Sequence, residues 1–263
     1  MFYLRIISSF IRASLQEEMA YRSNFWISLL NSLLNLITGV LGVVVLFGQV
    51  DSINGWDFAS TLVILGVYLS VWALRGLFIG PSLEALSGMD GEVWTGKLDF
   101  TLMQPVDVQF QASFRHWRLF RLFDLILGLG VLFAASQNLA GTVNPINFVA
   151  FLFSLLIGIF ILYSILLIFA GLVFWSPGFL FTWVFDGIFQ MARYPVGIYP
   201  NWVRLILTWV IPVGLITTVP AQALSGDMSE WLFIGAILFA VVLFSIGTAV
   251  FRIGLRRYAS ASS

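Results

Sequence analysis

The sequence predicts an all-α integral membrane protein with six transmembrane helices per subunit and an N-terminal amphipathic interface helix. Three observations predict this class. The 263 residues are 60% hydrophobic and only 10% charged, whereas soluble domains carry about 25% charged residues. Apolar runs long enough to cross a bilayer recur six times along the chain. With six crossings, all the basic residues also fall on one side of the membrane.

The first 24 residues predict a helix that lies in the membrane interface. The segment contains no long apolar core and no small-residue cleavage site, so we expect no cleaved signal peptide. Its two faces differ in polarity at helical spacing. The apolar face holds Leu4, Ile7, Ile11 and Leu15, and the polar face holds Arg5, Ser9, Arg12 and Gln16.

The predicted spans follow in order, each of roughly 20 mostly apolar residues. They occupy approximately residues 25–48, 58–80, 119–136, 147–173, 203–221 and 230–251. The third predicted span is short, and its first residues lie among charged residues. Turn-rich stretches separate the spans on one side, and a long segment at 81–117 lies on the other.

Positive charge predicts the orientation, because cytoplasmic loops are enriched in Lys and Arg. With both termini cytoplasmic, the only charged residues in the three outer loops are acidic. They are Asp51, Asp57, Asp227 and Glu230. The cytoplasmic face then receives Arg5, Arg12, Arg22, Arg75, Lys97, Arg115, Arg118, Arg121, Arg193, Arg204, Arg252, Arg256 and Arg257. Tryptophans fit the same boundaries, with Trp56 and Trp231 outside and Trp26 and Trp202 inside.

One further apolar stretch, residues 172–191, is hydrophobic enough to be a seventh span. It contains Pro177, Gly178 and Asp186, which are unfavourable in a lipid-exposed spanning helix. A seventh crossing would also move the basic C-terminus outside. We therefore expect residues 174–200 to form an in-plane helix on the cytoplasmic side.

Uncharged polar residues form a stripe on the first span, where they recur every three or four positions. In lipid such groups seek hydrogen bonds between helices or water. The stripe therefore indicates either helix packing, including packing against a second subunit, or the lining of a substrate path. Its members are Ser28, Asn31, Asn35, Thr38 and Gly42.

The fifth predicted span is interrupted by Pro212 and Pro220 around Thr217 and Thr218. Proline there permits a kink or a short re-entrant turn near the outer face. The residues indicate either a hinge or a packing notch on the substrate path.

The sequence offers no candidate catalytic or metal-binding site. The chain has no cysteine and one histidine, so thiolate and histidine-rich metal sites are excluded. No acid lies alone in the middle of a span as a proton relay requires. The nearest, Asp124, follows Arg121 by three residues, and an ion pair explains it.

The stretch GEVWTGKL, residues 91–98, resembles a nucleotide-binding P-loop with one position changed. Gly91, Gly96 and Lys97 match, but Leu98 replaces the hydroxyl residue that ligates magnesium. No strand precedes the stretch, and no second magnesium ligand follows it. We therefore expect no nucleotide to bind here.

The surrounding segment, residues 81–117, alternates acids with apolar residues. Such a pattern indicates either a protein-binding patch or side chains that pack back onto the protein's own helices or the lipid headgroups. Pro105 divides the segment, and a short helix is expected on each side. The apolar residues are Trp94, Phe100, Met103 and Phe110, and the acids are Glu84, Asp90, Glu92, Asp99 and Asp107.

Several stretches resemble the type-2 ABC exporter permeases, in a largely uncharacterised bacterial branch. GKLDFTLMQPVD resembles the family signature GELDF-LL-PV, and EMAYRSNFW, ARYPVGIYPNWVRLILTWVIPVGLITTVPAQAL and GLRRYASASS match in the same order. The resemblance implies a coupling helix between spans two and three that seats in an ATPase subunit. The implied coupling residues are Trp94, Lys97, Asp99, Phe100, Met103 and Pro105. Lys97 stands where the family commonly has an acid.

The resemblance also implies the partners. They are two cytoplasmic ABC ATPase subunits, which hold ATP and Mg, and a second permease, either identical or related. We expect membrane lipids and no nucleic acid among the other partners, no cofactor on this chain, and a location in the bacterial inner membrane. The alternatives are an ATP-independent secondary carrier or lipid scramblase, and a membrane scaffold.

Overall fold

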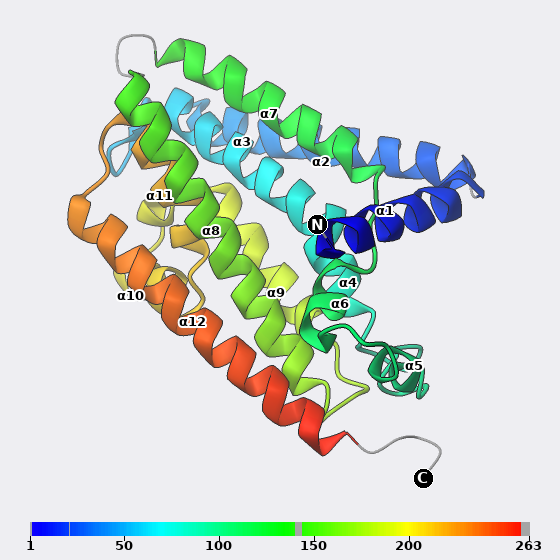
Figure 1. The fold of residues 1–263 in the computed structure, drawn as a ribbon. Coiled ribbons are helices and arrows are strands. Elements are labelled where there is room, and N and C mark those ends of the chain that lie inside the picture. The colour runs from blue at the N-terminus through cyan, green and yellow to red at the C-terminus, as the bar shows by residue number, and fades with distance from the viewer. Residues whose placement is uncertain (1, 21, 140–143, 259–263) are drawn as a thin grey trace.

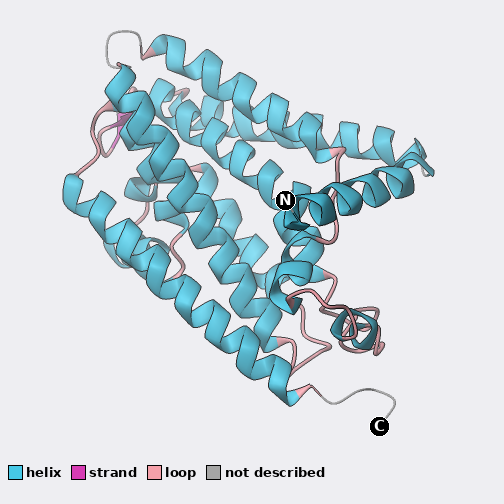
Figure 2. Ribbon diagram, in the orientation of Figure 1, coloured by secondary structure: helices cyan, strands magenta, loops and turns pink. Residues whose placement is uncertain are grey.

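The computed structural model describes residues 2–20, 22–139 and 144–258, and nearly all its elements are helices (Figure 1, Figure 2). Residues 140–143, between the third and fourth predicted spans, and residues 259–263 lie outside this description. Helices α2, α3 and α7 form one group, and α8, α11 and α12 form another. The elements are α1 (Phe2–Ala20), α2 (Arg22–Phe47), β1 (Ser52–Ile53), β2 (Trp56–Asp57), α3 (Phe58–Leu74), η1 (Arg75–Ile79), α4 (Gly80–Glu84), α5 (Leu98–Leu102), α6 (Val108–Phe114), α7 (Arg121–Asn138), α8 (Pro145–Leu172), α9 (Phe181–Phe189), η2 (Gln190–Arg193), η3 (Val196–Ile198), α10 (Asn201–Leu205), η4 (Ile206–Val210), α11 (Val213–Ser225) and α12 (Glu230–Arg257).

Four helices among the described residues are long and apolar enough to cross a membrane. They are Asn24–Phe47, Phe58–Glu84, Pro145–Leu172 and Glu230–Arg257, and the bent pair Asn201–Val210 and Val213–Ser225 raises the number to five if it forms one span. The chain is therefore an all-α, multi-pass membrane protein. Helix α7 is not among the four and carries Arg121 and Asp124 in its first turn. The six-span count stays a prediction.

A β-hairpin marks one end of the molecule, which we call the hairpin end. Strands β1 and β2 pair antiparallel, with Ile53 opposite Trp56. The turn residues Asn54 and Gly55 have φ values of 50° and 83°, the left-handed backbone that a tight two-residue hairpin requires. Asp57 then caps α3 by accepting the Ser60 N–H at 2.9 Å. The opposite end, which carries α4 to α6, is the α5 end.

Small residues let the long helices approach closely. A Cβ on Gly66 of α3 would lie 2.7 Å from the Leu132 backbone of α7, and one on Gly128 of α7 would lie 2.7 Å from the Ser70 nitrogen. In lipid no hydrophobic force drives helices together, so close backbone contact of this kind supplies much of the packing energy.

Residues 177–197 run lengthwise beside α3 and in the opposite direction, from the α5 end to the hairpin end. Four contacts trace this course. The segment is helical in α9, tightens into 3₁₀ turns, and is fully buried at Phe189 and Ala192. The contacts are Gly88 N to Pro177 O at 2.9 Å, Arg75 to Asp186 at 2.8 Å, the Arg193 guanidinium 5.3 Å from the Tyr68 ring, and Asn54 Nδ2 to Gly197 O at 3.0 Å.

The in-plane helix expected at 174–200 stays a prediction, and this course does not favour it. A segment that follows α3 from end to end cannot lie in one face of the bilayer if α3 crosses it. Pro177 and Asp186, which are unfavourable in a lipid-exposed helix, both lie against other parts of the chain. Irregular backbone is tolerated at membrane depth where protein surrounds it.

The predicted fifth span at 203–221 does not run from one end to the other. Its two helical parts meet at 95° next to Pro212. Asn201 and Gln222, near the two ends of the pair, line one cavity of about 450 Å³ together with Trp56 of the hairpin. The pair therefore starts and finishes at the hairpin end. Trp202 and Arg204 lie at that end too, whereas the orientation predicted from the charges places them with Lys97, which lies at the α5 end.

Candidate functional site

The segment between α4 and α6 exposes three large apolar side chains. Trp94 is 54%, Phe100 68% and Met103 75% exposed. Two short helices, α5 and α6, lie on either side of Pro105 as the sequence predicts. In Figure 1 this region extends away from the helix groups at the α5 end. These exposed fractions argue against packing onto the chain's own helices, and they leave a protein-binding patch or contact with lipid headgroups.

Buried contacts hold the segment in place beneath these side chains. Arg115 donates to the Thr101 hydroxyl at 2.8 Å and lies 3.3 Å from the Glu92 carboxylate. Gln111, which is 1% exposed, donates to the Thr101 carbonyl oxygen at 3.4 Å. Leu98 is completely buried. The exposed apolar residues therefore lie on an anchored surface, which reduces the entropy lost when a partner binds.

The stretch GEVWTGKL forms a compact turn in which each P-loop-like position has a structural role. Gly91 packs so closely against the Ser87 carbonyl that a Cβ would overlap it, and Gly96 has a φ of 73°. Leu98, which stands where a P-loop has its hydroxyl residue, is completely buried and anchors the turn. Lys97 is exposed and is the residue directly before α5. A helical turn, α4, precedes the stretch instead of a strand.

Asp99 connects the segment to the end of α12. Its carboxylate lies near Tyr258, and burial, followed by this carboxylate, raises the pKa of Tyr258 to about 12. Asp107 caps α6 by accepting the Phe110 N–H at 2.8 Å. Asp99 is one of the implied coupling residues, and the structure places it on α5, next to the residue that follows α12.

An ion cluster that sequence reasoning missed lies at the base of the segment. One Arg75 nitrogen lies 2.5 Å from the Glu84 carboxylate and 2.8 Å from the Asp186 carboxylate. The guanidinium also lies 5.2 Å from the Trp72 ring centre. The available signal was an acid within an apolar stretch, Asp186, which requires a cation from elsewhere in the fold.

The polar stripe of α2 faces outward along most of its length. Asn31, Asn35 and Thr38 are exposed, whereas Ser28 is half-buried. Thr38 donates to the Leu34 carbonyl oxygen at 2.6 Å within its own helix. The exposure of the asparagine amides is consistent with a second subunit or a substrate path on this face.

The predicted path residues of the fifth span lie inside the protein and apart from the α2 stripe. Thr217 donates to the Ala192 carbonyl oxygen at 3.3 Å, and Thr218 accepts the Val196 N–H at 3.4 Å. Pro212 is buried at the bend. These contacts show a packing role for both threonines, although Thr218 also lines the 450 Å³ cavity. The expected ion pair between Arg121 and Asp124 is confirmed at 2.7 Å.

Comparison with known proteins gives one family. The model described as "ABC-2 family transporter protein" matches residues 33–262, which is most of the chain. No curated protein matches the sequence. The matched range begins within α2 and includes the whole α5 end.

Proposed function

The chain belongs to the ABC-2 family of transporter proteins, and from this premise we propose that it is the permease subunit of an ATP-driven ABC exporter. Members of this family are the non-catalytic membrane component of a transporter. ATP and Mg would be held by two separate ATPase subunits in the cytoplasm. A second permease, identical or related, would complete the substrate path. The proposed location is the inner membrane of a bacterium.

The observation that carries this proposal is the anchored, apolar surface at the α5 end. Trp94, Phe100 and Met103 are all more than half exposed. Aromatic residues and Met are enriched in protein interfaces. The buried Arg115–Thr101 and Gln111–Thr101 contacts connect this surface rigidly to α6. Movement of a bound ATPase would therefore reach the spans rather than bend a loop.

We further propose the path of the chain through the bilayer. Its six crossings are α2, α3 with α4, α7, α8, residues 177–198 and α12. The bent pair α10–α11 enters from the outer face and returns to it. This path keeps both termini cytoplasmic, as expected. It replaces the fifth span predicted at 203–221 by residues 177–198, which run beside α3. Support comes from the contacts of Asp186 and Gly197 at opposite ends of α3.

The test is reconstitution with the ABC ATPase encoded beside the gene. The full chain is co-expressed with that ATPase, purified and placed in lipid nanodiscs. We expect the two to co-purify and the ATPase rate of the assembly to differ from that of the ATPase alone. The proposal is wrong if the chain binds no ATPase and moves lipid or solute in vesicles without ATP. That result would support the carrier or scramblase alternative.

A further inference from the structure

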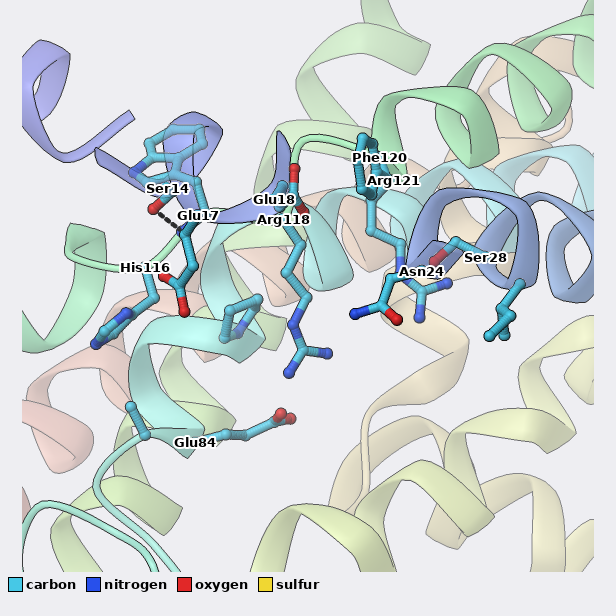
Figure 3. A pocket seen from close by; sticks show the side chains of 14 residues that line it. Ser14, Glu17, Glu18, Asn24, Ser28, Glu84, His116, Arg118, Phe120 and Arg121 are labelled. Atoms are coloured by element: carbon cyan, nitrogen blue, oxygen red, sulfur yellow. Dashed lines mark hydrogen bonds between the residues drawn. The ribbon is translucent and has the colours of Figure 1, made fainter. Parts of the chain in front are cut away.

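A cavity of about 650 Å³ lies where α1, the start of α2, α4 and residues 116–121 meet (Figure 3). It is separate from the exposed apolar surface around Phe100. Both acidic and basic side chains enter it from different elements. The charged residues that line it are Glu17, Glu18, Glu84, Arg118 and Arg121.

Three of these five charged groups already have partners. Glu84 lies 2.5 Å from the Arg75 guanidinium, and Arg121 lies 2.7 Å from Asp124. Glu18 accepts the Leu119 N–H at 2.9 Å. Their charges and hydrogen-bonding capacity are therefore largely used within the protein.

The side chains of Glu17 and Arg118 make no hydrogen bond or ion pair with any residue that the structure describes. Burial raises the pKa of the neighbouring Glu18, and the charge of Arg118 opposes that rise. Figure 3 shows both side chains directed into the cavity, Glu17 from α1 and Arg118 from the segment before α7. The cavity thus offers one carboxylate and one guanidinium with free capacity. A ligand that carries an anion and a cation on the same small group complements this pair.

The position of the cavity favours a lipid. Ile27 lines it from the first turns of α2 and is 58% exposed, and Phe120 lines it from the other side. Helix α1 is amphipathic, and such helices lie at the level of lipid headgroups. The acyl chains of a lipid in this place would extend along Ile27 and the exposed apolar face of α2.

We propose that the cavity binds the headgroup of a zwitterionic aminophospholipid, with its phosphate on Arg118 and its primary ammonium on Glu17. A guanidinium binds phosphate through two parallel hydrogen bonds, and a carboxylate accepts hydrogen bonds from an ammonium group. An anionic lipid without the amine would leave Glu17 unpaired and bring a second negative charge near it.

Native mass spectrometry of the purified full chain tests this site with three probes: phosphatidylethanolamine, phosphatidylglycerol and soluble phosphoethanolamine. We expect about tenfold tighter binding of phosphatidylethanolamine than of phosphatidylglycerol, since one charge-assisted contact is gained. Soluble phosphoethanolamine should bind weakly because it lacks acyl chains. Equal binding of the two lipids overturns the proposal, and tight binding of phosphoethanolamine overturns the assignment to a lipid.

Two variants locate the binding. Arg118→Gln and Glu17→Gln should each weaken phosphatidylethanolamine binding about tenfold. Arg252→Gln and Glu230→Gln, which change exposed charges on α12, should leave it unchanged. Unchanged binding in both cavity variants overturns the site. If a cavity variant fails to fold, the comparison of the three probes on the unmodified chain decides. No ATPase takes part, so the outcome is independent of the proposed transport function.

Discussion

The guanidinium of Arg75 lies 2.8 Å from the carboxylate of Asp186, which is 111 residues away in the chain. The same Arg75 nitrogen lies 2.5 Å from Glu84. One buried cation therefore balances two acids from two elements. This relationship fixes α9 against the junction of α3 and α4.

The first prediction concerns the two partners of this cluster. Arg75→Gln leaves two carboxylates facing each other without a cation, so we expect a loss of about 3 kcal/mol in the free energy of unfolding. Asp186→Asn leaves the Arg75–Glu84 pair intact and should cost less than about 1 kcal/mol. Thermal unfolding in detergent measures both. The double variant should recover part of the Arg75→Gln loss; equal losses in the two single variants would contradict the account.

The second prediction tests the path of the chain, for which the absence of cysteine in the sequence is an advantage. Trp202→Cys in α10 should react with a membrane-impermeant maleimide added from outside the cell. Met103→Cys, near α5, should react only when the membrane is opened. Both native side chains are exposed, 68% and 75% respectively. Labelling of Trp202→Cys only from the cytoplasmic side would refute the re-entrant α10–α11 pair.

The third prediction tests the role of the glycines in GEVWTGKL. Gly96→Ala should destabilise the turn by about 1–2 kcal/mol because its φ of 73° is left-handed. Gly130→Ala is the control, since a Cβ there meets nothing within 4 Å, and it should be neutral or stabilising. Thermal unfolding and limited proteolysis of the 85–105 region report the effect. If Gly96→Ala behaves like the control, the glycine serves some purpose other than the turn.

The fourth prediction concerns the outward-facing stripe of α2. Asn31→Leu and Asn35→Leu should change the pairing constant of two permeases by about threefold to thirtyfold, as interhelical hydrogen bonds in membranes contribute roughly 0.6–2 kcal/mol. Ser245→Leu on the exposed face of α12 is the control. Crosslinking and size-exclusion chromatography in detergent measure pairing. A variant with normal pairing and a normal ATPase rate in the reconstituted assembly would count against the stripe.

The apolar runs predicted where most helices lie, because the length and hydrophobicity of α2, α8 and α12 are local properties. The buried path of residues 177–197 is not local. Asp186 in this segment pairs with Arg75, directly after α3. The Gly197 carbonyl oxygen accepts a hydrogen bond from Asn54, just before the start of that helix. A single sequence shows that Asp186 needs a cation but does not identify Arg75 as its source, so the course of the segment cannot be predicted from its residues.

The candidate site was predicted unevenly for the same reason. Exposed apolar residues in a charged segment are recognisable from the sequence, and Trp94, Phe100 and Met103 are indeed exposed. The threonines of α11 also resembled polar groups on a path. Only their contacts with Ala192 and Val196 show that they satisfy buried backbone.

The central claim is that the surface around α5 transmits ATP hydrolysis on a partner to the spans. The most direct measurement is the ATPase rate of the reconstituted assembly, with Trp94→Ala and Phe100→Ala compared with Trp231→Ala. Trp231 is 83% exposed at the start of α12, and Trp231→Ala should leave the coupled ATPase rate unchanged. We expect the two α5-end variants to insert normally, with changes in stability within about 0.5 kcal/mol, and to lose most of the coupled rate. Unchanged ATPase binding and coupled rate in both would contradict the account.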